Sequence, residues 1–178
     1  SWEVLWQIKS TLALGVSAWG TALTLAITMG GMSLGAFTIS RVLKTKTILR
    51  PARVYAGLEW VIGASGLFLG QAFLFLEKLD TWAYAAIPEG GIAVHTLGIV
   101  ATLGIPTMAM GATMPILGLI ARQNRTSIAV FYGLNTLGAA AGTLLAAFLL
   151  IPAFGVSAAI LVVSAVNILV GFLAWTMP

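Results

Sequence analysis

The chain contains several long stretches that carry no charged side chain. One of them runs from Thr11 to Ser40 and is 30 residues long. A helix needs about 20 predominantly apolar residues to cross the roughly 30 Å hydrocarbon core of a bilayer. This pattern predicts an all-α fold, a polytopic transmembrane helix bundle with five full spans plus the end of a sixth at the N-terminus. The expected helical segments are 1–9, 11–40, 52–75, 92–121, 127–150 and 157–177.

The composition also predicts a membrane protein. Hydrophobic residues make up 60% of the chain and charged residues 8%, whereas a soluble domain has about 25% charged residues. A chain this apolar cannot cover itself with a polar surface, so lipid is the expected solvent. There is no cysteine, which excludes disulfides and thiolate metal sites, and one histidine with five acidic residues predicts no metal site.

The basic residues gather in two short connections, at 41–53 and 122–125. They are Arg41, Lys44, Lys46, Arg50, Arg53, Arg122 and Arg125. The positive-inside rule predicts that both connections and the C-terminus are cytoplasmic, and that the acidic connection from Glu77 to Gly91 lies on the other side. Topology thus explains the basic side chains, and we expect an integral-membrane location with no nucleic-acid partner. Contact with anionic lipids is an alternative role for the same basic side chains.

Small and aromatic residues recur at helical spacing. Three glycine pairs are four residues apart, a spacing that lets membrane helices approach closely, and we predict that they form packing faces. The pairs are Gly31 with Gly35, Gly66 with Gly70, and Gly138 with Gly142. Trp2 and Trp6 are also four residues apart, and they are predicted to lie at the membrane interface.

Glu59 is the candidate charge of an intramembrane site. It lies about six residues, or roughly 9 Å, inside its predicted span, and Ser33, Thr113 and Asn135 lie at a similar depth in three other spans. An ionisable residue at this depth usually faces the bundle interior or a water-filled cavity. The four residues are therefore candidates for a small polar site open to the cytoplasm. The alternatives to such a site are interhelical hydrogen bonding and extension of the Glu59 side chain to the interface. Asn167 is interpreted separately, as an interhelical residue.

The chain carries no recognisable catalytic motif. It has no P-loop, zinc-protease or nucleophile-elbow sequence, and no pair of carboxylates is placed for acid–base chemistry. We therefore predict no catalytic residue and no evident cofactor in this chain. A bound lipid, pigment or quinone remains compatible with its apolar and aromatic residues.

Four stretches resemble one known family. They are WEVLW at residues 2–6, MGGMSLG at 29–35, MGATMP at 110–115 and YGLNTLGA at 132–139. In this order, and over essentially the whole chain, they resemble the membrane-spanning domain of bacterial spermidine-synthase-like proteins, which are also described as fused to a major-facilitator-like region. The chain departs from the family after Trp6, where Gln7 and Ile8 precede Lys9 and the family has a basic residue.

The resemblance implies a domain in the bacterial cytoplasmic membrane that is followed by a cytoplasmic aminopropyltransferase-like domain, which makes spermidine from putrescine and decarboxylated S-adenosylmethionine. It assigns no catalytic role to Glu59, Asn135 or Thr136, which match family positions. We expect residues 1–178 to form a single transmembrane domain, with residues missing before Ser1 and possibly a soluble domain after Pro178.

Three functions follow from this reading. The first is a non-catalytic membrane domain that anchors or serves the cytoplasmic enzyme domain. The second is an accessory or structural subunit of a larger electron-transfer or photosynthetic membrane complex, and the third is a half-transporter for a small solute. The expected partners are the lipid bilayer together with other membrane subunits or a cytoplasmic domain.

Overall fold

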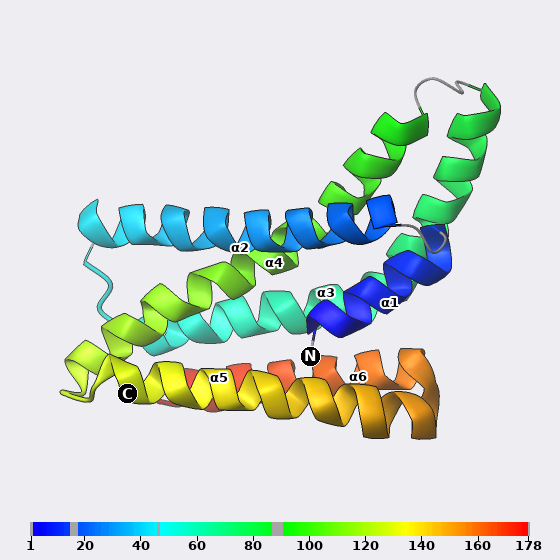
Figure 1. Ribbon diagram of the computed structural model, residues 1–178. Helices are drawn as coiled ribbons and strands as arrows, with labels where there is room; N and C mark the ends of the chain where they lie inside the picture. Colours follow the sequence, from blue (N-terminus) through cyan, green and yellow to red (C-terminus); the bar gives the residue numbers. More distant parts are fainter. Residues whose placement is uncertain (1, 15–17, 46, 87–90, 178) are drawn as a thin grey trace.

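The computed structural model describes residues 2–14, 18–45, 47–86 and 91–177, and it is helical in every element of that part of the chain. A helix satisfies its own backbone hydrogen bonds, so it suits a chain whose surroundings offer no water. The elements, drawn in Figure 1, are α1 (Trp2–Leu14), α2 (Ala18–Thr45), α3 (Pro51–Ala86), α4 (Gly91–Gln123), α5 (Ile128–Leu145), the π-helix η2 (Ala146–Leu150) and α6 (Ile151–Trp175).

Within the described residues, four helical stretches are long and apolar enough to cross a membrane, so the number differs from the predicted five spans plus the end of a sixth. They are Ala18–Thr45, Pro51–Ala83, Ala93–Gln123 and Ile128–Trp175. The last is 48 residues long and contains a break at Gly155, where φ is 80° and ψ is 167°. Beyond this glycine, α6 runs back toward the end of the molecule where α5 begins (Figure 1).

The helices pack in the spatial order α2, α4, α3 and α6, and α1 lies against α2, α3 and α6. The prediction that Trp2 and Trp6 lie at the membrane interface is wrong. Their side chains are only 4% and 1% exposed, and their rings stack with centroids 5.7 Å apart inside the hydrophobic core. α1 therefore acts as an apolar wedge between its neighbours. In contrast, α5 contributes no buried residue.

Glycines allow α2 and α4 to approach at backbone distance. A Cβ atom added at Gly35 would overlap the carbonyl oxygen of Met108, and one added at Gly111 would overlap the carbonyl oxygen of Met32. At Gly31 the added atom would meet the Thr107 side chain. Two of the four family-like stretches, 29–35 and 110–115, therefore pack against each other.

The other glycine pairs lie in different surroundings. Gly66 faces the Trp2 ring and the Ser164 hydroxyl, so it sits at the junction of α3, α1 and α6. At Gly70 and Gly138 an added Cβ atom would meet no atom within 4 Å. Gly142 is half-buried near the end of α5.

The predicted connections 41–53 and 77–91 are shorter than expected, because the helices continue beyond the apolar segments. Within the predicted 41–53 connection, α2 extends to Thr45 and α3 begins at Pro51. Within the predicted connection from Glu77 to Gly91, α3 extends to Ala86. Lys46 and residues 87–90 lie outside the described residues.

The turn between α4 and α5 has a well-defined local cause. The N–H of Thr126 donates to the carbonyl of Ala121, and the N–H of Arg125 donates to that of Arg122, the pair of bonds that ends a helix in a Schellman motif. Arg125 occupies the left-handed position with φ 54°. Ser127 then caps α5 by accepting a hydrogen bond from the N–H of Ala129 at 3.2 Å.

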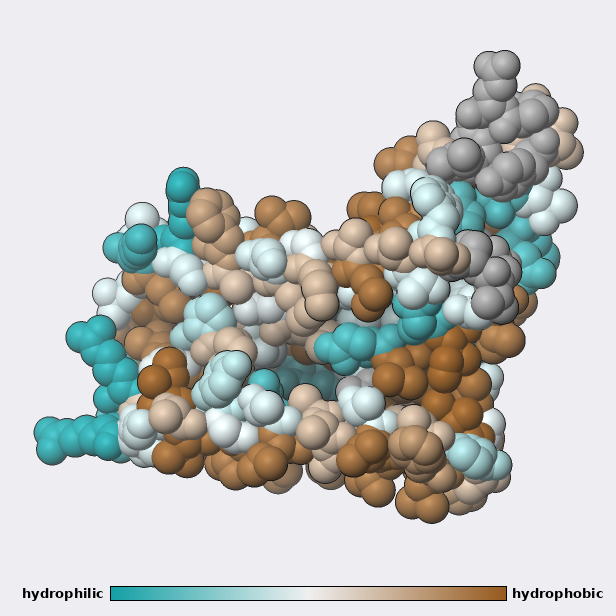
Figure 2. All heavy atoms as spheres, in the orientation of Figure 1, coloured by the Kyte–Doolittle hydropathy of each residue, from teal (hydrophilic) through white to brown (hydrophobic). Residues whose placement is uncertain are grey.

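Hydrophilic side chains gather at two ends of the molecule, with a smaller hydrophilic patch between them on the face in Figure 2. On the face in Figure 2, hydrophilic side chains gather mainly at the left, where α2 meets α3 and α4 meets α5, and near the far ends of α3 and α4 at upper right. We call the first the basic end, defined by Arg41, Lys44, Arg50, Arg53, Arg122 and Arg125, and the second the distal end, defined by Glu77, Lys78 and Asp80. Many large apolar side chains between them are exposed, which is consistent with contact with lipid.

We expect Gly35→Ala to lower the stability of the protein by about 1–3 kcal/mol, because the new methyl group cannot fit against Met108 without moving a backbone. The matched control is Gly30→Ala on the same helix, where nothing lies within 4 Å and alanine has the better helix propensity. Thermal unfolding in a mild detergent measures the stability of both variants. Equal melting temperatures for the two variants would contradict close packing of α2 on α4.

Candidate functional site

The candidate site centres on Glu59, whose side chain is held inside the protein. Glu59 is 7% exposed, and its Oε2 accepts a hydrogen bond from Nδ2 of Asn167 at 2.5 Å. The Oδ1 of Asn167 in turn accepts from Nε1 of Trp2 at 2.9 Å. Tyr55, one turn before Glu59 on α3, also interacts with the Glu59 side chain through its hydroxyl. We call these four residues the Glu59 junction.

Three helices position this junction. Glu59 is eight residues from the start of α3 and Asn167 is eight residues from the end of α6, so in this antiparallel pair both lie about 12 Å from the basic end. Small residues bring the two helices together, since an added Cβ atom at Gly63 would meet the Ser164 carbonyl oxygen and one at Gly171 would meet the Trp60 ring. α1 completes the junction with Trp2.

A second contact between α3 and α6 lies closer to the basic end. The Nε1 of Trp60 donates to the carbonyl oxygen of Ile168 at 3.3 Å, and its ring packs on Phe172 and Trp175 with centroids 5.2 and 5.4 Å away. The Arg53 guanidinium lies 4.8 Å from the centroid of the Trp175 ring. The end of α6 is therefore attached to the start of α3.

The structure does not bring the other three predicted polar residues to Glu59. Ser33 is exposed on α2, and its hydroxyl donates to the carbonyl of Met29 one turn earlier. Thr113 donates to the carbonyl of Met110 within α4, and Asn135 is exposed on α5. α2 and α5 make no substantial contact with α3 among the described residues. The interpretation of Asn167 as an interhelical residue is confirmed by its two hydrogen bonds.

Sequence reasoning missed Tyr55, Trp2 and Asn167 as the partners of Glu59. The sequence indicates only how deep each residue lies along its helix, and Asn167 does match Glu59 in depth. Depth gives the height of a residue in the bundle but not the direction in which its side chain points. That direction depends on which helices pack together, and the sequence pattern does not reveal this.

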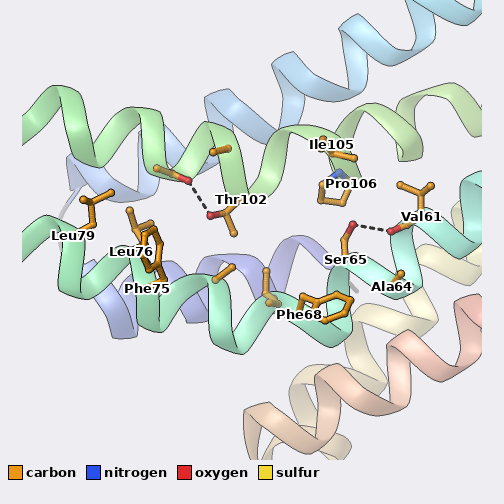
Figure 3. Close-up of a pocket in the computed structure, with 14 residues that line it drawn as sticks. Val61, Ala64, Ser65, Phe68, Phe75, Leu76, Leu79, Thr102, Ile105 and Pro106 are labelled. Atoms are coloured by element: carbon orange, nitrogen blue, oxygen red, sulfur yellow. Dashed lines mark hydrogen bonds between the residues drawn. The ribbon is translucent and has the colours of Figure 1, made fainter.

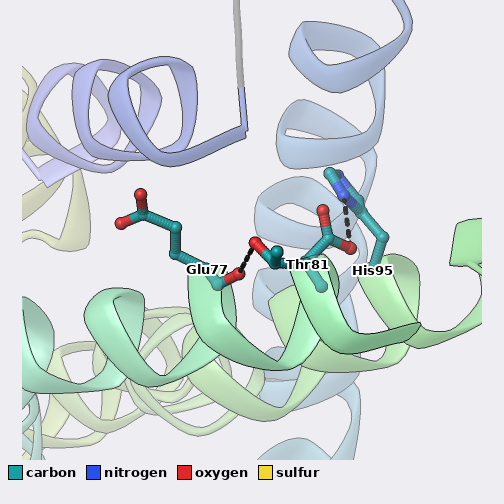
Figure 4. A network of polar contacts seen from close by, with 4 residues as sticks. Glu77, Thr81 and His95 are labelled. Carbon is teal, nitrogen blue, oxygen red and sulfur yellow. Dashed lines mark hydrogen bonds and ion pairs between the residues drawn. The ribbon is translucent and has the colours of Figure 1, made fainter. Parts of the chain in front are cut away.

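A second polar cluster lies at the distal end, where the ends of three helices meet. The Nδ1 of His95 on α4 lies 3.3 Å from Oδ1 of Asp80 on α3, and the Trp19 ring of α2 lies with its centroid 5.3 Å from that of the imidazole. The His95 and Asp80 side chains are both largely buried. Figure 4 shows that Glu77, on the preceding turn of α3, points away from His95.

The Glu59 carboxyl accepts hydrogen bonds from the Asn167 amide on α6 and from the Tyr55 hydroxyl on α3. Among the described residues no group of three or more metal-binding side chains comes together. The bonds from Asn167 to Glu59 and from Trp2 to Asn167 join three helices, so the Glu59 junction is an interhelical polar contact of the kind that holds membrane helices in one arrangement.

Comparisons with known proteins give no assignment. No protein-family model matches the chain, and neither a curated protein nor a solved structure matches it at a significant level. The family resemblance stated from the sequence stays a prediction.

We expect Asn167→Leu to lower stability by about 1–3 kcal/mol, because it leaves the Glu59 carboxyl and the Trp2 indole N–H buried without partners. Asn135→Leu is the matched control, since Asn135 is exposed and this change should cost little. The double variant Glu59→Met with Asn167→Leu should recover part of the loss, because both polar partners are then removed together.

Thermal unfolding of the purified protein in detergent measures the stability of all three variants. If Asn135→Leu proves as damaging as Asn167→Leu, or if the double variant shows no recovery, the Glu59 junction does not hold α3 to α6.

Proposed function

We propose that this chain is a non-catalytic integral-membrane domain that anchors or serves a cytoplasmic aminopropyltransferase-like domain, in the same polypeptide or in a partner. The resemblance of the four motif stretches supports the enzyme class. In this proposal α2 to α6 cross the membrane in five passes, with the chain reversing at Gly155. α1 is 13 residues long, about 20 Å, and enters the bundle only part of the way across.

The observation that carries the proposal is the position of the end of α6. The contact between Arg53 and Trp175 ties that end to the start of α3, beside the basic connections. The positive-inside rule assigns those connections to the cytoplasm. Polypeptide that continues from α6, or a partner bound there, would therefore meet the cytoplasmic face, where the substrates of an aminopropyltransferase are found.

The motif stretches also fit a supporting role. Residues 29–35 and 110–115 form the close contact between α2 and α4, and residues 2–6 form the α1 wedge. Packing therefore explains these three stretches without any catalytic function. Glu59, a buried ionisable group within a candidate span, is also engaged in an interhelical contact.

The fourth stretch, residues 132–139, favours a second candidate function, an accessory subunit of a larger membrane complex. It lies on α5, which buries none of its residues, and it leaves the Asn135 amide exposed within a candidate span. A polar amide facing lipid is costly, whereas a neighbouring transmembrane helix can hydrogen-bond it. The transporter hypothesis receives less support, because the predicted polar residues do not converge on Glu59.

Site-specific photo-crosslinking in the native membrane tests the first proposal. A crosslinking residue in place of Leu49, which is 84% exposed at the basic end, should capture a cytoplasmic aminopropyltransferase-like domain. The same residue in place of Trp82, which is 58% exposed at the distal end, should not. The captured complex should transfer an aminopropyl group from decarboxylated S-adenosylmethionine to putrescine, whereas residues 1–178 alone should not.

The outcome also separates the two candidate functions. Capture of an integral-membrane protein from position Leu137 on α5, with nothing captured from Leu49, would favour the accessory subunit. A captured complex without aminopropyltransferase activity would contradict the proposed enzyme class.

A further inference from the structure

A groove lined by α3 and α4 lies between two candidate membrane spans. We propose that it binds one acyl chain of a phospholipid from the leaflet at the distal end of the molecule. This goes beyond the proposed function, since it does not depend on what the chain anchors.

The groove is a hollow of about 540 Å³ on the outer side of the α3–α4 pair (Figure 3). This falls within the roughly 300–1,000 Å³ range of ligand pockets. α4 lines it from Gly98 to Pro106, about 12 Å of helix, which fits within one half of the roughly 30 Å hydrocarbon core. Both walls belong to candidate membrane spans, so the groove opens toward lipid.

Side-chain size explains why the hollow exists. Near its distal end Leu76 packs directly against Gly98, so the helices are in contact there. Farther along, the facing residues include Ala64, Ala72 and Ala101, which are too small to fill the space between the helices. Phe68 and Phe75 stand at the rim and are largely exposed. The result is an apolar channel with aromatic edges.

The polar groups of the groove favour a hydrocarbon chain over a pigment or a quinone head group. Only two hydroxyl side chains line the groove, and each donates its hydrogen bond to a backbone carbonyl oxygen of its own helix. The Ser65 hydroxyl donates to the carbonyl oxygen of Val61 at 2.7 Å, and the Thr102 hydroxyl donates to that of Gly98 at 2.9 Å (Figure 3). No hydroxyl donor remains free to recognise a carbonyl-bearing ring, whereas an acyl chain needs none.

The distal end supplies a charge for the head group. Lys78 is exposed on α3 directly before Leu79, which lines the groove, and three residues after Phe75 on its rim. Residues three apart are neighbours on a helix surface. A lysine at the lipid–water boundary can extend its ammonium group to a phosphate while its stem stays on apolar surface. Glu77 is exposed beside it, and Asp80 faces His95 instead.

Lipid retention by the purified full chain tests the proposal. After extensive detergent washing, native mass spectrometry should find one phospholipid bound to the wild-type chain. Ala101→Phe, which places a ring in the groove, should reduce its occupancy at least about tenfold, since tenfold corresponds to about 1.4 kcal/mol and two buried methylene groups contribute about that much. Ala140→Phe, on the exposed surface of α5, is the matched control and should retain the lipid.

A second variant keeps the test decisive if Ala101→Phe folds poorly. Ala64→Phe blocks the same groove from α3 and should give the same loss at an unchanged melting temperature. Lys78→Gln should weaken retention of phospholipid without affecting the fold. Absence of any retained lipid, equal retention by Ala101→Phe and Ala140→Phe, or a retained pigment or quinone in place of a phospholipid would each overturn the proposal.

Discussion

The arrangement depends on close backbone contact between helices in surroundings that offer little hydrophobic driving force for association. In lipid, helices associate through packing and interhelical hydrogen bonds, because lipid tails are as apolar as the side chains they would replace. The α2–α4 contact supplies the packing through Gly31, Gly35 and Gly111. The α3–α6 contact adds the bond from Asn167 to Glu59. These two pairs, joined through α3 and α4, hold the bundle together.

The sequence predicts the helical class and the approximate positions of the helices, since long uncharged segments admit few other folds in a membrane. It does not predict where the helices end. Charged residues mark where lipid gives way to water, and a helix can continue past that boundary, as α2 does to Thr45 and α3 does to Ala86. The span count also differs, because the predicted segments 127–150 and 157–177 fall in one helical stretch, Ile128–Trp175, which breaks at Gly155.

The candidate site could be predicted only in part. Glu59 stood out because it is ionisable and deeply placed, and the structure finds it buried. Its partners could not be derived, because helix rise gives depth alone while the choice of Asn167 over Asn135 depends on which helices are neighbours. For the two tryptophans of α1 too, the sequence does not show which helices surround the side chains. Trp2 and Trp6 have the spacing and chemistry of interface residues, yet they fill the centre of the bundle.

The most direct test of this arrangement is the side of the membrane on which each turn lies. The chain contains no cysteine, so single cysteines introduced at Leu49, Lys78, Arg125 and Phe154 can be labelled without background. With a membrane-impermeant maleimide on sealed vesicles, the account predicts that positions 49 and 125 label from one side and positions 78 and 154 from the other. Labelling of position 154 from the same side as position 49 would contradict the reversal at Gly155 and the arrangement built on it.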